Sequence, residues 1–389
     1  MDKRNVYLDN NATTQMAPEV VEIMRQNEGL YANASSMHTL GRISATAIDW
    51  ARTQLASLID CDKSEIYFNS GATESNNTVF NIMRDLIDDG SKRDRIIISA
   101  VEHPASIETA KYLKKRGYKV DFCPVDRIGF IDLEKLEEMM GDDVLLVSCM
   151  TGNNESGVIM PVKEVSLIAR KYGAYMHTDA TQAIGKIPVS VKDLDVDYLS
   201  MSGHKFYGPK GIGVLYIRNK APKSPLLHGG HQEGGFRPGT YSTQSILGIG
   251  KAAELARLGI DEERRQLWHL REMLREGIEK NIPNVQINGS REYEHQLPGT
   301  LDVSFLYSEG ESILLYLDLE GIEVSTGSAC ASGSLEPSYV MMATGMDVEL
   351  AHGSIRFSFG RYNTEEDVEY VLEKLPGIIE RIRKMSTRR

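Results

Sequence analysis

Short runs of β-branched and aromatic residues alternate with segments of helical period between residues 65 and 217. The run from Glu65 to Asn69 is strand-like, and after a turn the apolar residues from Val79 to Ile87 fall at i, i+3, i+4, i+7 and i+8, as one helix face requires. This alternation predicts an α/β fold with a mostly parallel central sheet that is flanked by helices. The other predicted strands of this region are Arg95 to Ala100, Lys119 to Val125, Val144 to Met150, Ala174 to Thr178, Tyr198 to Met201 and Gly211 to Ile217.

Polar residues follow four of these strands, close to the point where each strand ends. They are His103, Asn154, Asp179 and Lys205. Ligands of an open α/β sheet bind outside the carboxyl ends of its strands, so we expect these four side chains to converge on one site.

The pattern changes near residue 250. A long charged helical stretch, about Gly248 to Asn281, leads into fewer strands, such as Gly299 to Phe305 and Ile355 to Ser358. This change indicates a second, smaller α+β domain. The predicted division is a large domain over residues 16–255 and a small domain formed by residues 1–15 and 256–389.

Composition and charge narrow the class of protein. The 389 residues are 41% hydrophobic and 25% charged, which is typical of a globular protein. No apolar run suits a membrane span or a signal peptide, so we expect a cytoplasmic protein without a membrane contact. The net charge of -11 argues against direct binding to DNA. The basic residues near the carboxyl terminus favour a solvated helix end over a surface for an acidic partner.

Two short segments, His177 to Gln182 and Ser202 to Lys205, present a carboxylate and a lysine at strand ends. Pyridoxal 5'-phosphate needs an amine for its Schiff base, an anion for its pyridine nitrogen and donors for its phosphate. Asp179 and Lys205 supply the first two, and Gln182 could bind a ring oxygen. The alternatives are that Asp179 only caps a helix, that Lys205 is a solvated loop lysine and that Gln182 is an ordinary polar residue on a first helical turn.

Phosphate donors are available in two turns. The segment Ser70 to Thr73 precedes a helix, so its backbone N–H groups and the Thr73 hydroxyl can bind an anion. Ser202 and His204 flank the lysine and can also donate to phosphate. The alternative for the first turn is that Gly71 serves turn geometry and that Thr73 caps the helix.

Cys330 lies in a run of small residues from Ser325 to Ser334, which predicts a flexible, exposed loop. An accessible thiol there can act as a nucleophile, although an accidental surface cysteine is the alternative. The other three cysteines, Cys61, Cys123 and Cys149, form neither a disulfide framework nor a CxxC zinc motif. Arg356 interrupts an apolar strand, which indicates a carboxylate partner from a substrate or from a structural ion pair.

Together these residues resemble the cysteine desulfurases, the NifS/IscS class of fold-type I pyridoxal-phosphate enzymes, over nearly the whole chain. The matching segments are Tyr7 to Thr14, Ser70 to Asn77, Glu102 to Ala105, Asn153 to Glu155, His177 to Gln182, Ser202 to Lys205, Gly327 to Cys330 and Arg356 to Arg361. The loop at about 325–338 is similar to that of the NifS/IscS group rather than the SufS group. The chain departs from the family pattern at Asn33-Ala34, Ser156 and Pro238, none of which replaces a residue with an assigned catalytic role.

The resemblance implies a role for each site residue. Lys205 would carry the cofactor and move protons, His103 would stack on the ring, Asp179 would pair with the ring nitrogen and Gln182 would bind the ring hydroxyl. The remaining cofactor contacts would come from Ala72, Thr73, Asn154, Ser202, His204 and, from the other subunit of a homodimer, Thr240. The substrate would be held by Arg356, Asn154 and Asn33.

The implied reaction removes sulfur from L-cysteine, gives L-alanine and leaves a persulfide on Cys330. The sulfur would then pass to an acceptor, such as an iron–sulfur scaffold protein of the IscU/NifU kind. Two alternatives stay open: a selenocysteine lyase or C–S lyase of the same fold, and a non-catalytic sulfur-assembly scaffold. His228 and His231 are too few to predict a metal site, so no metal is expected.

Overall fold

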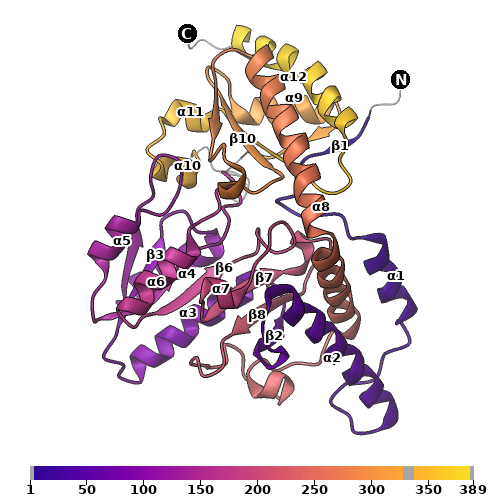
Figure 1. Cartoon of the computed structure of the whole chain (residues 1–389), viewed down its shortest axis with the longest axis vertical. Helices are drawn as coiled ribbons and strands as arrows, with labels where there is room; N and C mark the ends of the chain where they lie inside the picture. The colour runs from indigo at the N-terminus through magenta and orange to yellow at the C-terminus, as the bar shows by residue number, and fades with distance from the viewer. Residues whose placement is uncertain (1–3, 327–336, 386–389) are drawn as a thin grey trace.

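The computed structural model describes residues 4–326 and 337–385. Its centre is a sheet of seven strands in the order β2-β8-β7-β6-β5-β3-β4 (Figure 1). Strand β8 is antiparallel to both neighbours, and the other described pairs of this sheet are parallel. The strands are β2 (Ile66–Asn69), β3 (Arg95–Ser99), β4 (Lys119–Cys123), β5 (Val144–Ser148), β6 (Tyr175–Asp179), β7 (Tyr198–Ser202) and β8 (Gly213–Ile217).

Helices cover both faces of this sheet. Successive side chains of β3 point to opposite faces, so Ile96 and Ile98 pack with Phe80 in one buried cluster, whereas Ile97 packs with Leu55 in another. The first cluster lies under α3 (Ala72–Asp88) and α4 (Pro104–Lys115). The second lies under α1 (Pro18–Gln26), α2 (Thr39–Ile59), α5 (Leu133–Met139), α6 (Val162–Lys171), α7 (Val191–Leu194) and the start of α8 (Thr243–Asn281).

A second unit lies at the far end of the long helix α8 (Figure 1). Its antiparallel sheet has the order β12-β10-β9, and a parallel pair joins β1 to β11. A separate core contains Leu8, Leu274, Phe305 and Val371. The elements are β1 (Val6–Tyr7), β9 (Val285–Asn288), β10 (Thr300–Phe305), β11 (Ile322–Glu323), β12 (Ser354–Ser358), α9 (Gly310–Leu319), α10 (Tyr339–Ala343), α11 (Val348–His352) and α12 (Glu365–Met385).

The predicted α/β fold with a smaller α+β part is confirmed, and every strand predicted from the pattern is present. Several boundaries differ by one or two residues. Strand β6 continues to Asp179, so this residue is the last of its strand rather than the first after it. The short strands β1, β9 and β11 were not predicted, and the two-residue strands β1 and β11 carry too little pattern for a prediction. The proposed domain boundary at residue 255 falls inside α8 and stays a prediction.

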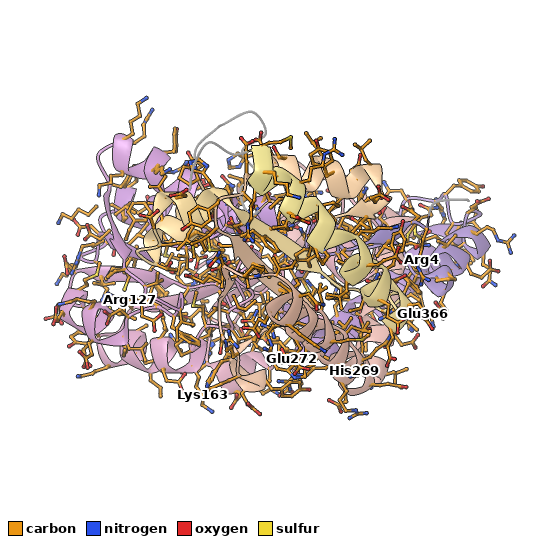
Figure 2. All side chains as sticks on the ribbon, turned by 90° about the horizontal axis from the view of Figure 1, so that it is seen from above. Arg4, Arg127, Lys163, His269, Glu272 and Glu366 are labelled. Atoms are coloured by element: carbon orange, nitrogen blue, oxygen red, sulfur yellow. The ribbon has the colours of Figure 1, made fainter. Side chains whose placement is uncertain are left out.

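Charged side chains cover the outside of the molecule. Arg127, Lys163 and Glu366 are exposed and project away from the ribbon (Figure 2). Within residues 4–326 and 337–385, no helix is both long enough and apolar enough to cross a membrane.

Candidate active site

A cavity of about 520 Å³ lies at the carboxyl ends of the central strands. The four residues predicted to converge, His103, Asn154, Asp179 and Lys205, all line it. Five more of the predicted site residues line it as well: Ala72, Thr73, Gln182, Ser202 and His204. Because these nine residues come from distant parts of the chain, the strand ends bring them together as the topology predicts.

Lys205 ends a single 3-10 turn, η2 (Gly203–Lys205), that directly follows β7. Its Nζ donates to two backbone oxygens of the amino-terminal segment, Asn11 O at 2.6 Å and Ala12 O at 2.8 Å. The same segment is attached to the turn by Thr14, whose N–H and hydroxyl both donate to His204 O. The amino terminus therefore holds the lysine amine at the cavity.

Asp179 is buried, and donors hold both of its carboxylate oxygens. Asn76 Nδ2 donates to Oδ2 at 2.7 Å, and the Thr181 N–H donates to Oδ1 at 3.0 Å. The contact with Thr181 is the local turn that the capping alternative anticipated. The contact with Asn76, from α3, fixes the carboxylate in an orientation toward the cavity that it lines. Both interpretations of this aspartate therefore describe part of its environment.

A buried acid and a histidine lie side by side next to this carboxylate. The His103 Nδ1 accepts the Ala105 N–H at 3.1 Å, so Nε2 carries the hydrogen of the neutral ring. Burial lowers the pKa of His103, and Lys205 lowers it further against the opposing effect of Asp179. Burial also raises the pKa of Glu102 to about 8, and its Oε2 has no hydrogen-bond partner among the described residues. The cavity therefore has a neutral imidazole at this wall, with its Nε2–H as a donor.

The start of α3 has N–H groups that can bind an anion. Its N-cap is Gly71, which has no side chain to cap the helix, and the first helical hydrogen bond is the one from Ser75 N to Gly71 O. The N–H groups of Ala72, Thr73 and Glu74 come before that bond and so have no partner within the helix, and all three residues line the cavity. Gly71 has a φ of 150°, which a residue with a side chain rarely adopts.

Two side chains on the opposite turn, Ser202 and His204, line the same cavity. A Cβ at Gly71 would lie only 3.6 Å from Ser202 Oγ, so the hydroxyl is close to the start of α3. His204 Nδ1 is 3.1 Å from Thr13 Oγ1. Burial, together with the positive charges of Lys205, Lys210 and Lys186, lowers the pKa of His204 to about 4. An uncapped helix start, a hydroxyl and a neutral imidazole fit a phosphate, and Asp179 and Lys205 fit a pyridoxal ring, so the residues present fit pyridoxal phosphate.

Arg356 lies next to the cavity but is not among the residues that line it. It is 4% exposed on β12. One terminal nitrogen donates to Asn154 O at 2.9 Å and the other to Asp9 Oδ1 at 2.8 Å. The structural ion pair is therefore present. The side-chain amide of Asn154 lines the cavity and has no hydrogen-bond partner among the described residues.

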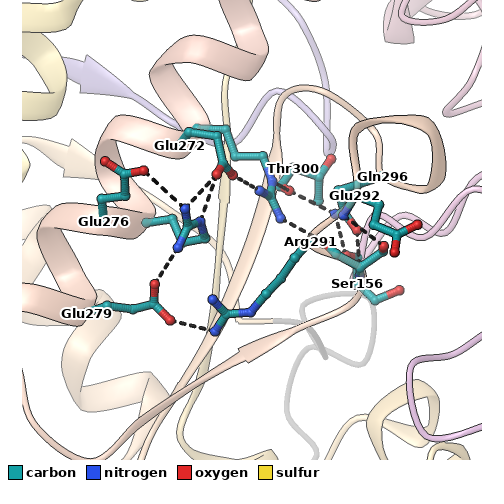
Figure 3. A network of polar contacts seen from close by, with 11 residues as sticks. Ser156, Glu272, Glu276, Glu279, Arg291, Glu292, Gln296 and Thr300 are labelled. Atoms are coloured by element: carbon teal, nitrogen blue, oxygen red, sulfur yellow. Dashed lines mark hydrogen bonds and ion pairs between the residues drawn. The ribbon is translucent and has the colours of Figure 1, made fainter.

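A buried glutamine connects the Asn154 turn to the second unit. Gln296 Nε2 donates to Ser156 O at 2.8 Å and to Thr300 O at 3.0 Å (Figure 3). Thr300 Oγ1 in turn accepts from Asn11 Nδ2 at 2.9 Å. The backbone at Ser156, where the chain departs from the family pattern, is thus held in place by this network.

Two predicted residues lie elsewhere. Asn33 and Thr240 are exposed and do not line the cavity of this single chain. Cys330 falls outside the described residues. His228 and His231 are exposed, and no group of three potential ligands that could hold a metal is found in residues 4–326 and 337–385.

Sequence reasoning missed three residues that support the site. Asn11 holds Lys205 through its carbonyl, Asn76 holds Asp179, and Lys186 contacts Gln182. Asn11 and Asn76 lie in segments that carry the resemblance, but nothing in their spacing indicates a contact with a residue more than 100 positions away. Lys186 follows Gln182 by four positions, which places them on one face of a helical turn, and this signal was available.

Comparisons with known proteins agree with the geometry. The family model described as "Aminotransferase class-V" matches residues 6–371. "Cysteine desulfurase IscS" of Dictyoglomus turgidum is 49% identical over 385 residues, which cover 99% of this chain and 97% of that protein. "Cysteine desulfurase IscS" of Methanosarcina thermophila is 46% identical and covers 99% of this chain and 94% of that protein. A solved structure titled "NIFS-LIKE PROTEIN" has a TM-score of 0.90 at 39% identity and covers 97% of this chain and 100% of that chain.

Fold and site thus define a fold-type I pyridoxal-phosphate enzyme. The chain belongs to the aminotransferase class V family, and within it to the NifS/IscS class of cysteine desulfurases. Its cofactor is pyridoxal 5'-phosphate, and its reaction is the transfer of sulfur from cysteine.

Proposed function

We propose that this cysteine desulfurase works through Lys205, Asp179 and His103 at the cavity and passes the sulfur to Cys330. The observation that carries the proposal is that nine predicted residues line one cavity, with the lysine amine and the carboxylate both in its wall. When bound there, pyridoxal phosphate supplies an electron sink for the carbon that loses a proton.

The cofactor would be held at both of its ends. Its phosphate would lie at the start of α3, against Ala72, Thr73, Ser202 and His204. Its ring nitrogen would face Asp179, whose charge is kept in place by Asn76 and the Thr181 N–H. An anion fixed in a cavity stabilises a protonated ring nitrogen without reorganisation during the reaction.

Lys205 and His103 would move protons. The Lys205 amine is held at the cavity by the carbonyl oxygens of Asn11 and Ala12. Once it is released from those oxygens and deprotonated, it can take the α-proton. His103 has a lowered pKa, so at neutral pH its ring is uncharged and available for proton transfer.

The substrate carboxylate would be held by Arg356 and Asn154. The guanidinium lies against Asn154 O, and the Asn154 amide lines the cavity. Asn33 would join them from an exposed loop that does not reach this cavity within one chain.

Cys330 would receive the sulfur. The three cysteines of the described residues are poor nucleophiles: burial raises the pKa of Cys61 and of Cys123 to about 12, and that of Cys149 well above its usual value. Attack by a Cys330 thiolate on the substrate sulfur would form an S–S bond and break the Cβ–S bond. The carbon side keeps the electron pair of the broken bond, takes up a proton and leaves as alanine.

A second copy of the chain would complete the site. Near Asn33 the side chains of Tyr31, Met37 and Leu40 are 81%, 89% and 50% exposed, which is unusual for apolar groups on a free surface. Thr240 is also exposed and outside the cavity of its own chain. A homodimer that covers this surface would supply Thr240 to the phosphate of the partner. Light scattering on the purified protein tests the dimer.

The persulfide sulfur would pass to an acceptor protein, for which an iron–sulfur scaffold of the IscU/NifU kind is the first candidate. The names of the IscS relatives support this pathway. The cytoplasmic location also remains a prediction, which cell fractionation tests.

The proposal is tested by comparing the visible absorption and the products of two proteins. The purified chain should show a cofactor band and form alanine from cysteine, whereas Lys205→Ala should lack the lysine-dependent band and the activity. A non-catalytic scaffold would show no cofactor band and no alanine formation, in the wild type as well as in Lys205→Ala. A band without alanine formation from cysteine would favour another enzyme of the same fold.

A further inference from the structure

A second lysine, Lys186, is buried and lies next to the cavity residue Gln182. Its Nζ donates to Gln182 Oε1 at 2.6 Å and to Asn11 Oδ1 at 2.8 Å. Among the described residues, no carboxylate forms an ion pair with this amine. Burial lowers the pKa of Lys186 well below its usual value, and Lys205 and Arg356 lower it further, against a weak opposing effect of Glu263. A methionine would fill the same space without the free-energy cost of burying an amine. The presence of a lysine here must therefore be explained by the contacts of its amine.

The contacts of Nζ fix the direction of two side-chain amides. An amide group has an oxygen that accepts and a nitrogen that donates, and inverting it exchanges the two. A lysine amine has at least two N–H donors whether it is charged or neutral. It therefore turns both amide oxygens, Gln182 Oε1 and Asn11 Oδ1, toward itself and both amide nitrogens away.

The nitrogen of Gln182 consequently faces the cavity side of this cluster. Nε2 donates one hydrogen to Asn11 O at 2.9 Å, the same carbonyl that Lys205 Nζ contacts. The second hydrogen of Nε2 has no acceptor among the described residues, and Gln182 lines the cavity. A donor without a protein partner at a cavity wall is suited to an acceptor atom of a ligand.

The nitrogen of Asn11 is directed to the substrate side. Its Nδ2 donates to Asn154 O at 3.1 Å and to Thr300 Oγ1 at 2.9 Å. Asn154 O also accepts from Arg356. The Lys186 amine thus orients two amides. One is that of Gln182 at the cavity wall, and the other is that of Asn11, which shares the acceptor Asn154 O with Arg356.

We propose that Lys186 is a positioning residue that makes Gln182 present an N–H, rather than its oxygen, to an anionic ligand oxygen in the cavity. The inference rests on the proposed function, in which that ligand is the ring of the cofactor with its ionisable hydroxyl. An inverted Gln182 would place its carbonyl oxygen against the ligand oxygen, and the two acceptors would repel. Lys186 itself touches neither the ligand nor the substrate.

A double-mutant cycle on the full-length chain separates positioning from mere packing. The variants are Lys186→Met, Gln182→Ala and the double variant, and the measured quantity is the dissociation constant of pyridoxal phosphate by absorbance titration. Each single change should weaken binding about tenfold, the effect of one lost hydrogen bond to a charged atom. If Lys186 acts through Gln182, the double variant should bind within about twofold of Gln182→Ala. The inference would be overturned if Lys186→Met bound the cofactor with wild-type affinity. It would also be overturned if the loss of affinity in the double variant equalled the product of the losses in the two single variants.

A second variant leaves Lys186 intact and so avoids a folding defect from its removal. Gln182→Glu keeps an oxygen toward Lys186 and replaces the amide nitrogen by a second oxygen that faces the ligand. It should bind pyridoxal phosphate more weakly than Gln182→Ala, because an acceptor is worse there than no group. Binding as tight as that of the wild type would contradict the inference. Failure of the wild-type chain to bind the cofactor would refute the proposed function itself. If the wild type binds the cofactor and the effects of the two substitutions on affinity multiply in the double variant, only the role of Lys186 is refuted.

Discussion

Arg356 Nη2 donates to Asp9 Oδ1 at 2.8 Å, and this ion pair joins β12 to the amino-terminal segment beside the cavity. The other terminal nitrogen holds Asn154 O, and Nε has no partner among the described residues. The guanidinium is therefore fixed by two contacts while N–H groups remain for a further acceptor. A pre-oriented guanidinium of this kind is well suited to bind a carboxylate with two hydrogen bonds.

Replacing Arg356 by lysine should raise the KM for cysteine at least tenfold. A lysine has one nitrogen and cannot hold Asp9 and Asn154 while it also binds a carboxylate with two donors. The cofactor band should be unchanged, because Arg356 does not line the cofactor cavity. Steady-state kinetics and an absorption spectrum of the same preparation measure both effects.

Arg170→Lys is a matched control for this change. Arg170 also pairs with carboxylates, those of Asp195 and Asp197, but lies outside the cavity. Its KM should stay at the wild-type value. An unchanged KM in Arg356→Lys would remove this residue from the substrate site.

Asp179→Asn should reduce alanine formation about 100-fold or more while the protein stays folded. The amide keeps the shape of the side chain but removes the fixed negative charge that would face the ring nitrogen. The loss of one preorganised electrostatic contact typically has an effect of this size. Single-turnover rates with saturating cysteine, normalised to bound cofactor, measure it. A variant that retains more than a tenth of the rate would show that the charge is not needed.

Glu102→Gln should become more stable than the wild type as the pH rises from 5 to 8. The pKa of Glu102 is raised by burial to about 8 in the folded chain, compared with an ordinary value near 4.5 when unfolded. Between these values the folded state binds the extra proton, so the wild type loses stability as pH rises. Glutamine has no such proton, and the difference in the free energy of unfolding should grow by about 1 kcal/mol per pH unit. Urea unfolding at pH 5 and pH 8 measures it.

The exposed Glu134 provides the control for the pH experiment. Glu134→Gln removes a carboxylate of the same type from the surface, and its stability should follow the wild type at both pH values. If the difference in the free energy of unfolding between Glu102→Gln and the wild type is the same at pH 5 and pH 8, Glu102 is ionised in the folded chain. That result would contradict the raised pKa of the buried Glu102.

The central sheet could be predicted because most of its strands are short, largely apolar runs that alternate with segments of helical period. The convergence of His103, Asn154, Asp179 and Lys205 followed from the same reasoning, since the topology fixes where strand ends meet. Local pattern alone could not separate a substrate arginine from a structural ion pair at Arg356, and the structure shows that the ion pair exists.

Contacts that join distant segments could not be predicted. Asn11 and Lys205 are 194 positions apart, and their hydrogen bond depends on how the amino-terminal segment crosses from the second unit to the central sheet. Asn76 lies in a helix whose apolar face was recognised, but its polar contact with Asp179 follows from the packing of α3 on β6. Such contacts are set by tertiary packing, on which hydrophobic periodicity carries no information.

The most direct test of the central claim is the mass of Cys330 after one turnover with cysteine in the absence of an acceptor. The account predicts one added sulfur on the peptide that contains Cys330 and one alanine per active site. Cys330→Ala should form neither, whereas Cys61→Ala, which removes a thiol with a raised pKa, should form both. Alanine formation by Cys330→Ala at the wild-type rate, or added sulfur on another cysteine, would contradict the account.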